Sequence, residues 1–424
     1  MKYLEGPFAP VDTEITAYDL PVTGSIPAEL DGRYVRNGPN PLKPADPATH
    51  IWGVGNGMVH GVRLRDGKAE WYRNRFVHGP GFAPMVHVIE HGRQTFAMAE
   101  GGVAPALLDH ELNTVGPAEL GATAEGFTAG AHAKHDPRTG ELHSLAYVPG
   151  RDFVQYIVTD AQGATASAVT IPMSRTPFLH DFALTATRVV LWDTPLGFDG
   201  MDVRWQPELP TRVGVMSRAG GAVRWHAIDP VHVSHTLNAY DDGDAVVVDL
   251  VTAQGPFDAA DPGAIHPTLD RWTVTGDKLH QQRIDDRPQD FPRVNDAFAA
   301  HPHRYGYSSA TALYGIPFAP EGTPSDGVFT NALVKHDIWR ATSEVHAFGP
   351  DEAVGEAAFA AVGPGEDEGY LLAYVHNPER GAADLVVLAA QDFTGEPVAR
   401  VHLPARVPLG LHGNWIPEHP PVAA

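Results

Sequence analysis

The sequence contains no cysteine, fewer basic than acidic residues and no long apolar run. Without cysteine, disulfide bonds, thiolate metal ligands and cysteine nucleophiles are all excluded. Any metal must therefore be bound by histidine, carboxylate or carbonyl groups. Lysine and arginine total 30 against 52 aspartate and glutamate residues, which gives a formal net charge of −22. This balance argues against a nucleic-acid-binding surface or a polybasic membrane anchor, because both require clustered basic residues.

Segments that would direct or anchor the chain are also lacking. No apolar run reaches the roughly 18 residues that a membrane-spanning helix needs. Residues 1–8 lack the charged region and apolar core of a secretory signal, so we expect a cytoplasmic protein. The 43 glycines and 38 prolines are scattered rather than gathered in a linker, which predicts one domain over residues 1–424.

Short strand-like segments separated by turn signals recur along the chain. The clearest is a hairpin in which residues 60–65 and 69–73 alternate polar and apolar side chains around Asp66-Gly67. Convincing helical periodicity is scarce, and residues 103–112 are the best short candidate for a helix. Many short strands and few helices predict an all-β sandwich, barrel or propeller. Further strands are predicted at residues 142–148, 188–192, 245–251, 370–375 and 384–389.

Four histidines, His132, His180, His235 and His412, are separated by 48, 55 and 177 residues, close to one, one and three multiples of a common unit. One seventh of the chain is roughly 60 residues, the length of a propeller blade with its loops. Blades around an axis can each direct one side chain to a shared point. The spacing therefore favours a propeller whose imidazoles meet at a metal, and imidazole suits iron, zinc, copper or nickel better than magnesium or calcium.

At these histidines the sequence resembles the carotenoid cleavage oxygenase family, which includes apocarotenoid oxygenases and lignostilbene-type dioxygenases. The shared motifs cover nearly the whole chain, from Gly-Arg-Tyr-Val-Arg-Asn-Gly-Pro-Asn-Pro at residues 32–41 to Val-Pro-Leu-Gly-Leu-His-Gly-Asn-Trp-Ile-Pro at residues 407–417. Between them lie the other histidine contexts and residues 55–61, 290–295 and 366–372. The resemblance implies an all-β fold, a seven-bladed β-propeller with a loop and helix cap over a central metal site.

The resemblance also implies one ferrous ion, Fe(2+), per chain. Four histidines leave open positions on an octahedral ion, where oxygen can bind beside an alkene. The site then needs no nucleophilic side chain, because iron carries the oxygen chemistry and the protein supplies metal geometry and an apolar tunnel. The implied ligands are His132, His180, His235 and His412.

Carboxylates are expected to accept hydrogen bonds from the ligating imidazoles and so to fix their orientation. Glu100 and Glu356 match two of the three glutamates that do this in the family. The third position is Asp290, whose carboxylate lies about 1.3 to 1.5 Å further back than that of glutamate. We therefore expect the direct hydrogen bond to be lost at Asp290 unless the backbone shifts or a water molecule bridges the gap.

The segment that feeds the site in typical family members is short in this chain. Those members carry a long apolar segment, thought to dip into membranes, where this chain has only residues 78–84. We therefore expect weak or no membrane association and a water-dispersible substrate, such as a short apocarotenoid or a phenylpropenoid or stilbene.

Two positions argue against a clamp for a phenol. The stilbene-cleaving branch resembles a pattern with lysine just before the glutamate at position 100, where this chain has Ala99, and Phe76 stands where a tyrosine partner is expected. Aromatic residues close to the histidines in sequence are candidates for the lining of a substrate tunnel, namely Phe127, Phe178, Trp192 and Trp415.

Other possible sites match no known pattern. His301 and His303 have strand spacing, and His135 follows His132 by three residues, but none of them matches a ligand of the family. The glycine-rich residues 53–61 lack the Gly-Lys-Ser/Thr ending of a phosphate-binding loop.

The predicted function is a non-heme, Fe(II)- and O2-dependent dioxygenase that cleaves a carbon–carbon double bond of a conjugated substrate into two carbonyl products. A monooxygenase outcome, or isomerisation on the same scaffold, stays open. The alternative is a non-catalytic β-propeller binding protein with a structural histidine cluster. A propeller hydrolase would hold calcium through carboxylates and amides, whereas the constellation here is imidazole. Substrate, scissile bond and oligomeric state are not determined by the sequence.

Overall fold

Strand-forming segments separated by tight turns produce an all-β chain in the computed structural model. The structure describes residues 4–44, 46–47, 50, 53–79, 84–199, 202–253, 267–310 and 331–418. Its strands form seven sheets of four or more strands and one two-stranded hairpin among these residues. The sheets are the blades of a seven-bladed β-propeller, which confirms the predicted fold class. The chain divides into two compact units, unit 1 (Met1–Met98, Ala106–Pro117 and Glu344–Ala424) and unit 2 (Ala99–Pro105 and Ala118–Ser343).

Unit 1 contains three sheets, which bring the N-terminal and C-terminal parts of the chain together. The first has the order β1 (Ile15–Tyr18), β5 (Lys68–Phe76), β4 (Asn56–Arg65), β3 (Gly32–Asn40), β33 (Gly413–Pro417). The second has the order β2 (Val22–Gly24), β32 (Ala399–His402), β31 (Ala382–Ala389), β30 (Gly369–Asn377), β28 (Ala353–Val354), and β29 (Ala358–Ala361) also pairs with β30. The third has the order β6 (His87–His91), β7 (Gln94–Met98), β8 (Ala106–Leu108), β9 (Thr114–Pro117).

The predicted hairpin is present as β4 and β5. Asp66 and Gly67 connect the strands with φ angles of 49° and 71°, and Arg65 pairs with Lys68. Two successive left-handed residues define the type I′ turn, whose twist matches that of the strands it joins. The sequence signal was sufficient here because the turn chemistry is local.

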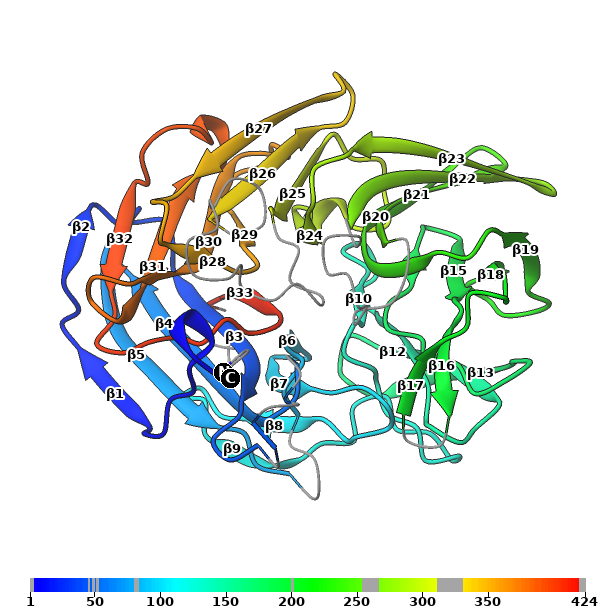
Figure 1. Cartoon of the computed structure of the whole chain (residues 1–424), viewed down its shortest axis with the longest axis horizontal. Helices are drawn as coiled ribbons and strands as arrows, with labels where there is room; N and C mark the ends of the chain where they lie inside the picture. The colour runs from blue at the N-terminus through cyan, green and yellow to red at the C-terminus, as the bar shows by residue number, and fades with distance from the viewer. Residues whose placement is uncertain are drawn as a thin grey trace. The chain divides into compact units, whose positions relative to one another are not determined.

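Unit 2 contains the three sheets whose first strands include or closely follow His132, His180 and His235. Figure 1 labels strands of each of these sheets. The first two have the orders β10 (Lys134–His135), β11 (Leu142–Ala146), β12 (Phe153–Thr159), β13 (Thr165–Pro172), and β14 (Ala183–Leu184), β15 (Arg188–Asp193), β18 (Thr211–Ser217), β19 (Arg224–Ile228). The third has the order β20 (His232–Asp242), β21 (Ala245–Ala253), β22 (Thr268–Thr275), β23 (Lys278–Asp285). The last contains β24 (Asp290–Arg293), β25 (Tyr305–Ser309) and β26 (Ala332–Asp337), with β27 (Thr342–Ala347) at the boundary between the units. The hairpin is formed by β16 (Leu196–Asp199) and β17 (Asp202–Trp205).

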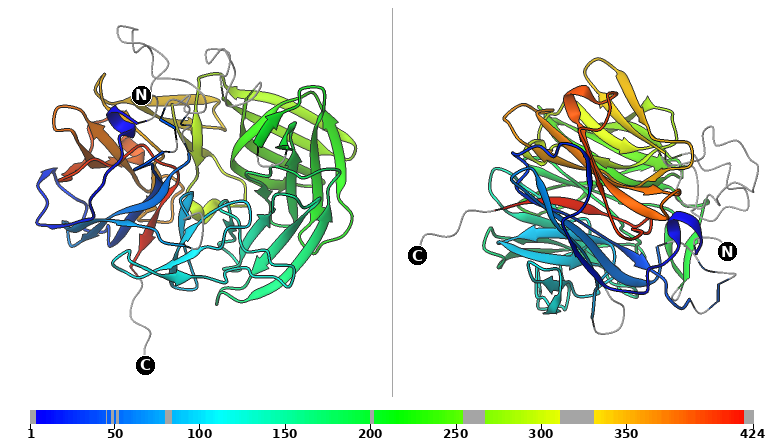
Figure 2. Two further views of the ribbon diagram at one scale, coloured as in Figure 1. Left: turned by 60° about the horizontal axis from the view of Figure 1, so that its bottom comes forward. Right: turned by 90° about the vertical axis from the view of Figure 1, so that its left-hand side faces the viewer.

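Neighbouring sheets of unit 2 pack face to face through their apolar side chains. Val190 and Trp192 of β15 share one buried cluster with Val248 of β21 and Trp272 of β22. Figures 1 and 2 show these two sheets lying beside one another. Because strand residues on both faces of such a sheet are buried, the position of each strand is set by two neighbours at once. The strands next to the histidines are therefore held in place by packing on both faces of their sheets.

The predicted helix at residues 103–112 is wrong. This segment contains β8, and Leu112 has a φ of 69°, which ends any regular helix. The Asp109 carboxylate accepts hydrogen bonds from the amides of Glu111 and Asn113, so the side chain competes with helical bonding. Helical structure in the described chain consists of the short 3-10 segments η1 (Gly6–Phe8), η3 (Asp296–Phe298) and η4 (Ala390–Asp392), and none of it is long and apolar enough to span a bilayer.

The other predicted strands are confirmed with small differences at their ends. The strand expected at residues 142–148 is β11 and ends at Ala146. The strands expected at 188–192, 245–251, 370–375 and 384–389 are β15, β21, β30 and β31, each longer than predicted. The extra residues pair with neighbouring strands, a tertiary contribution that a local pattern does not reveal.

Candidate metal centre

Three of the predicted histidines lie together in unit 2. His132 lies just before β10, His180 just before β14, and His235 within β20, and these are the first strands of three successive sheets. Ring centroids are 4.4 Å apart for His132 and His180, 4.8 Å for His180 and His235, and 5.1 Å for His132 and His235. Their candidate ligand nitrogens all lie within 4.8 Å of one another. Each blade edge thus delivers one imidazole to a common point.

The hydrogen bonds of His180 and His235 fix their tautomers. His180 Nδ1 lies 2.7 Å from Glu100 Oε1, and His235 Nδ1 lies 2.7 Å from Asp290 Oδ1. A carboxylate only accepts hydrogen bonds, so each Nδ1 carries a proton and each Nε2 has a lone pair. The two Nε2 atoms are 3.0 Å apart. Two lone pairs at this distance repel one another unless a cation or a proton lies between or beside them.

A metal ion fits this geometry. Imidazole nitrogens lie about 2.1 Å from a bound divalent metal, so two ligands at right angles are separated by about 3.0 Å. Tetrahedral ligands at the same bond length would be about 3.4 Å apart. Burial lowers the pKa of His180, but the Glu100, Asp181 and Asp290 carboxylates together raise it above its ordinary value, so a positive charge is favoured at this position. The donor set therefore suits two adjacent positions of an octahedral cation.

The Glu100 carboxylate contacts two histidines and a tyrosine. Its Oε1 lies 2.7 Å from His180 Nδ1 and 3.3 Å from His132 Nε2, and its Oε2 accepts a hydrogen bond of 3.1 Å from the Tyr147 hydroxyl. Burial, reinforced by Glu100, raises the pKa of Tyr147 well above its ordinary value, so the hydroxyl stays protonated and donates. Tyr147 was not predicted from the sequence. Its only signal was a tyrosine at the end of a predicted strand.

Asp290 reaches its histidine directly, although its side chain is shorter than that of glutamate. The carboxylate is completely buried, and Oδ1 accepts hydrogen bonds from His235 Nδ1 at 2.7 Å, Ser234 Oγ at 3.2 Å and Phe291 N at 2.8 Å. The strand pairing is irregular between Asp290 and Arg293, and Phe291 has a φ of 53°. This left-handed residue changes the direction of the chain directly after Asp290. The direct hydrogen bond to His235, which the sequence predicted to be lost without a backbone shift or a bridging water molecule, is present.

In unit 1, His412 forms the same kind of pair with Glu356. His412 lies just before β33, and its Nδ1 is 3.0 Å from Glu356 Oε1. The other carboxylate oxygen accepts a hydrogen bond of 2.8 Å from the amide of Gly413. Both side chains are buried, and the His87 ring lies against His412 at a centroid distance of 5.2 Å. Glu356 therefore fixes both the imidazole and the backbone that follows it.

The four tunnel candidates have different surroundings. The Phe178 ring is nearly parallel to His180, with centroids 6.1 Å apart, and lies 5.9 Å from Tyr147. Phe127 packs in a buried cluster with Phe153, and Trp192 lies in the core between two sheets. Trp415 packs against the core of unit 1. Phe178 is thus the candidate that contacts an imidazole, whereas Phe127, Trp192 and Trp415 contribute to hydrophobic packing.

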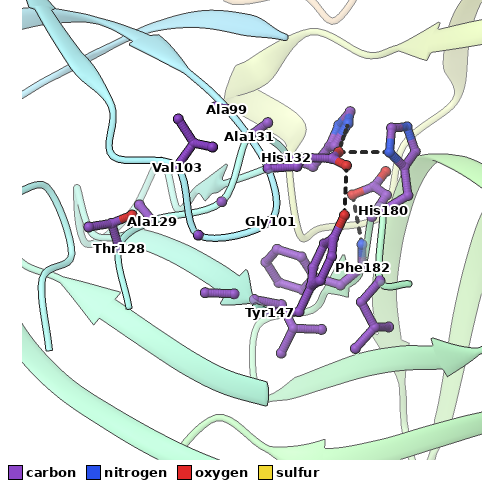
Figure 3. Close-up of a pocket in the computed structure, with 17 residues that line it drawn as sticks. Ala99, Gly101, Val103, Thr128, Ala129, Ala131, His132, Tyr147, His180 and Phe182 are labelled. Carbon is purple, nitrogen blue, oxygen red and sulfur yellow. Dashed lines mark hydrogen bonds and ion pairs between the residues drawn. The ribbon is translucent and has the colours of Figure 1, made fainter. Parts of the chain in front are cut away.

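A small pocket adjoins His132 and His180 (Figure 3). Its cavity volume is about 10 Å³, close to what a single water molecule requires. Ala99 forms part of the wall, so no cationic side chain projects from that position. The pocket therefore offers room for about one water-sized molecule beside the imidazoles. Part of the remaining wall is formed by glycine and alanine, namely Gly101, Gly102, Ala129, Gly130, Ala131 and Ala146.

The histidines predicted not to be ligands have other surroundings. His303 is fully buried, with Nε2 3.2 Å from Asp249 Oδ2 and Nδ1 3.2 Å from Asn238 Nδ2. These contacts link β20 and β21 to the loop before β25. His135 is part of β10, where it pairs with Leu142. His301 is partly buried, and its backbone carbonyl accepts a hydrogen bond from Asn238.

Comparisons with known proteins agree with this geometry. The chain matches the family described as retinal pigment epithelial membrane protein over residues 8–84 and 82–417. It is 38% identical to a carotenoid cleavage oxygenase from Mycobacterium tuberculosis, over 98% of this chain and 97% of that protein. It is 26% identical to an isoeugenol monooxygenase from Pseudomonas nitroreducens, over 98% of both chains. Among solved structures, it resembles a lignostilbene dioxygenase from Pseudomonas brassicacearum, with a TM-score of 0.89, 26% identity and 99% of each chain covered.

Proposed function

This chain belongs to the carotenoid cleavage oxygenase family, and on that premise we propose that it is an Fe(II)-dependent dioxygenase that cleaves a conjugated alkene into two carbonyl products. Oxidative alkene cleavage is the chemistry that the family membership implies. The identity of the metal, the roles of individual residues and the substrate are the proposed parts.

We assign one Fe(2+) per chain to His132, His180, His235 and His412, the histidine group of the described chain that could hold a metal ion. The observation that carries this assignment is the 3.0 Å separation of two Nε2 atoms whose Nδ1 atoms are both bonded to carboxylates. Imidazole ligands suit iron, and four of them leave two positions of an octahedral ion open. Bound iron would supply oxygen activation beside the alkene.

The protein's own groups prepare this site. Glu100, Asp290 and Glu356 hold the Nδ1 protons of His180, His235 and His412, so that the Nε2 lone pairs are directed away from the carboxylates. Burial excludes bulk water from most of these groups, whereas His180 and Glu100 stay partly exposed, at 14% and 16% of their side-chain area. The buried groups are His132, His235, Asp290, Glu356 and His412. Tyr147 and Ser234 hold the carboxylates in turn.

The proposed substrate is a short conjugated molecule, an apocarotenoid or a phenylpropenoid or stilbene. Ala99 in the pocket wall offers no cation for a phenolate, which favours the apocarotenoid. The short segment at residues 78–84, of which residues 80–83 lie outside the described part of the chain, supports a substrate that is dispersed in water. Weak or no membrane association follows, and vesicle flotation tests it, since tight binding to vesicles would contradict a dispersed substrate.

The function is tested with protein loaded with iron under anaerobic conditions. Oxygen and a panel of apocarotenals, stilbenes and phenylpropenoids are then supplied, and aldehyde products are identified by mass. Labelled dioxygen distinguishes the two outcomes, because a dioxygenase places label in both products and a monooxygenase in one. Metal analysis should give about one iron per chain.

Variants separate the proposal from its alternative. His180→Ala and His412→Ala remove one imidazole from each unit and should abolish iron binding and product formation, whereas His301→Ala should retain both. Protein that binds calcium and no iron would rule out the oxygenase. Binding of panel compounds without turnover by fully iron-loaded protein would favour a non-catalytic propeller with a structural histidine cluster.

A further inference from the structure

A buried carboxylate lies directly after one of the proposed ligands. Asp181 follows His180, and its side chain is 1% exposed. Its Oδ1 lies 2.8 Å from Lys134 Nζ and accepts a hydrogen bond of 2.7 Å from the amide of Phe182. Its Oδ2 accepts a hydrogen bond of 2.7 Å from the amide of Thr236. Both oxygens are therefore occupied by donors of this chain.

Each of these donors stands close to a proposed ligand in the sequence. Lys134 follows His132 by two residues, and Thr236 follows His235 directly. One carboxylate thus connects the three segments that carry the imidazoles of unit 2. Glu100 and Asp290 orient the imidazole rings, whereas Asp181 connects the segments to which the rings are attached.

The connection falls at an irregularity of β20. Pairing between β20 and β21 shifts between Val233 and Thr236 and again between Thr236 and Asn238, so His235 projects from a bulged part of the strand. Bulges re-aim side chains but disturb the ladder of backbone hydrogen bonds. A buried amide left without an acceptor costs about 1–3 kcal/mol. The Thr236 amide finds its acceptor in Asp181, and the Thr236 hydroxyl donates to the Phe182 carbonyl at 3.1 Å.

Lys134 makes the buried charge tolerable. An ionised carboxylate taken out of water is costly unless a partner charge and hydrogen bonds compensate for it. Lys134 supplies the charge at 2.8 Å, and its Nζ also lies 5.9 Å from the centre of the Phe182 ring. The ion pair and the two amides together account for the burial of Asp181.

We infer that Asp181, neutralised by Lys134, is a positioning residue that sets the mutual placement of the imidazoles of His132, His180 and His235. This inference rests on the proposed iron site. Asp181 is not itself a ligand, since its two oxygens already accept hydrogen bonds from the chain. Its effect is to hold the bulge of β20 against the segment that precedes β14, and thereby to maintain the 3.0 Å separation of the two Nε2 atoms.

The inference is tested with Asp181→Asn and Lys134→Met in the full chain. Loss of the Asp181 charge or of its Lys134 partner should weaken Fe(II) binding about 10–100-fold. This is the range typical of changes to residues that hydrogen-bond to metal ligands. Affinity is measured by anaerobic competition with a chelator.

If cobalt(II) replaces iron, the absorption spectrum of the cobalt-loaded Asp181→Asn variant should differ from that of wild type, because the ligand geometry changes. In the metal-free protein, the Thr236 amide should exchange its hydrogen faster. Lys134→Arg, which keeps the charge, should restore most of the affinity.

Asp241→Asn is the matched control. Asp241 makes a similar link between the same two sheets, accepting hydrogen bonds from Arg188 Nη1 at 2.8 Å, Thr187 N at 2.9 Å and Thr185 Oγ1 at 2.9 Å. It lies near the end of β20 that is remote from His235, so its loss should lower the thermal stability and leave iron affinity and the cobalt spectrum unchanged.

The outcomes separate this inference from the proposed function. Wild-type protein that binds no iron would contradict both the proposed function and the positioning role of Asp181. Wild-type protein that binds iron, together with Asp181→Asn of equal affinity and unchanged cobalt spectrum, would end only the positioning role. Equal weakening by Asp181→Asn and Asp241→Asn would also end it, because the effect would then reflect general stability.

Discussion

Single residues of this chain repeat one arrangement, an imidazole whose Nδ1 is bonded to a carboxylate. It occurs for His180 with Glu100 and for His235 with Asp290 at 2.7 Å, and for His412 with Glu356 at 3.0 Å. The first two pairs lie in unit 2 and the third in unit 1. The shorter aspartate makes this contact at the same distance as Glu100 does, next to a left-handed residue, Phe291.

Asp290→Glu is predicted to destabilise the protein, although it restores the residue that the family ordinarily has. Asp290 is completely buried, and its Oδ1 already accepts three hydrogen bonds, so an added methylene overpacks the site. The expected cost is about 1–3 kcal/mol, measured by urea unfolding of metal-free protein. Asp290→Asn, which keeps the size, should instead preserve stability better and weaken metal binding more. Equal stability of Asp290→Glu and wild type would contradict the packing argument.

Tyr147→Phe is predicted to weaken metal binding less than Glu100→Gln does. The tyrosine hydroxyl donates to Glu100 Oε2, the oxygen that does not face the His180 ring, so its loss leaves the imidazole contact in place. Glu100→Gln removes the charge that both His132 and His180 face. Competition with a chelator gives the order of the two affinities, and the reverse order would show that Tyr147 has a more direct role.

At the scale of elements, the proposed metal ligands of unit 2 lie at the beginnings of strands or at a bulge within a strand. His132 and His180 lie just before the first strands of their sheets, and His235 lies where β20 loses its regular register. Regular strands present side chains at fixed intervals, whereas bulges and strand beginnings allow a side chain to be aimed. The contacts of Asp181 with Lys134 and with the Thr236 amide then hold these points in place.

The contacts of the buried His143 with neighbouring elements predict that the protein loses stability in acid. His143 on β11 is buried, its Nδ1 lies 2.7 Å from the Tyr156 hydroxyl, and its Nε2 faces Arg218. Burial, with Arg218, lowers the pKa of His143 to about 3. The unfolded chain binds a proton below its ordinary pKa of about 6.5, but the folded chain does not. Stability from this group is therefore complete above pH 6.5 and falls as the pH drops from 6.5 towards 3.

His143→Asn tests this contribution, because its amide can keep the hydrogen bond to Tyr156 and does not titrate. Urea unfolding of metal-free protein at several pH values between 7.5 and 4.5 should show a shallower dependence on pH for the variant than for wild type. Identical slopes would mean that His143 is protonated in the folded state. The comparison of slopes removes the contributions of the remaining histidines.

At the scale of the whole molecule, segments from both ends of the chain complete the sheets of unit 1. β33, a partly buried edge strand, pairs with β3, from Gly32 opposite Pro417 to Arg36 opposite Gly413. β1 and β2, by contrast, are mostly exposed strands at the outer edges of two sheets. The two ends therefore contribute unequally to stability, and His412 directly precedes the strand that contributes more.

Deletion of residues 413–424 is predicted to prevent folding of unit 1, whereas deletion of residues 1–24 should leave a folded protein with a lower melting temperature. The first deletion removes the partner of β3 and the buried Ile416, and the second uncovers the edges of β5 and β32. Uncovered edges pair between molecules, so the N-terminal deletion should also aggregate on heating. Circular dichroism and light scattering measure both effects. A cooperatively folded C-terminal deletion would contradict the prediction.

The sequence by itself determined the features that depend on local chemistry or on motif order. Asp66 and Gly67 specify their turn, alternating residues specify β4 and β5, and the ordered motifs specify the family and its all-β propeller. The motifs also pointed to Glu100, Asp290 and Glu356, each of which contacts the Nδ1 of one predicted histidine. That the four histidines are metal ligands stays a prediction. The helix at residues 103–112 was wrong because the Asp109 side chain and strand pairing override a weak periodicity.

Only the tertiary structure decided how these residues meet. Asp290 contacts His235 next to the left-handed residue Phe291. Glu100 accepts a hydrogen bond from Tyr147. Asp181 connects the three chain segments that carry His132, His180 and His235. The packing of Phe127 and Trp192 into cores, and the stacking of Phe178 on His180, depend equally on neighbouring strands. Such contacts join residues tens of positions apart, and their distances are set by register, bulges and the packing of sheets. A local pattern carries no information on those quantities, because each depends on a second segment of the chain.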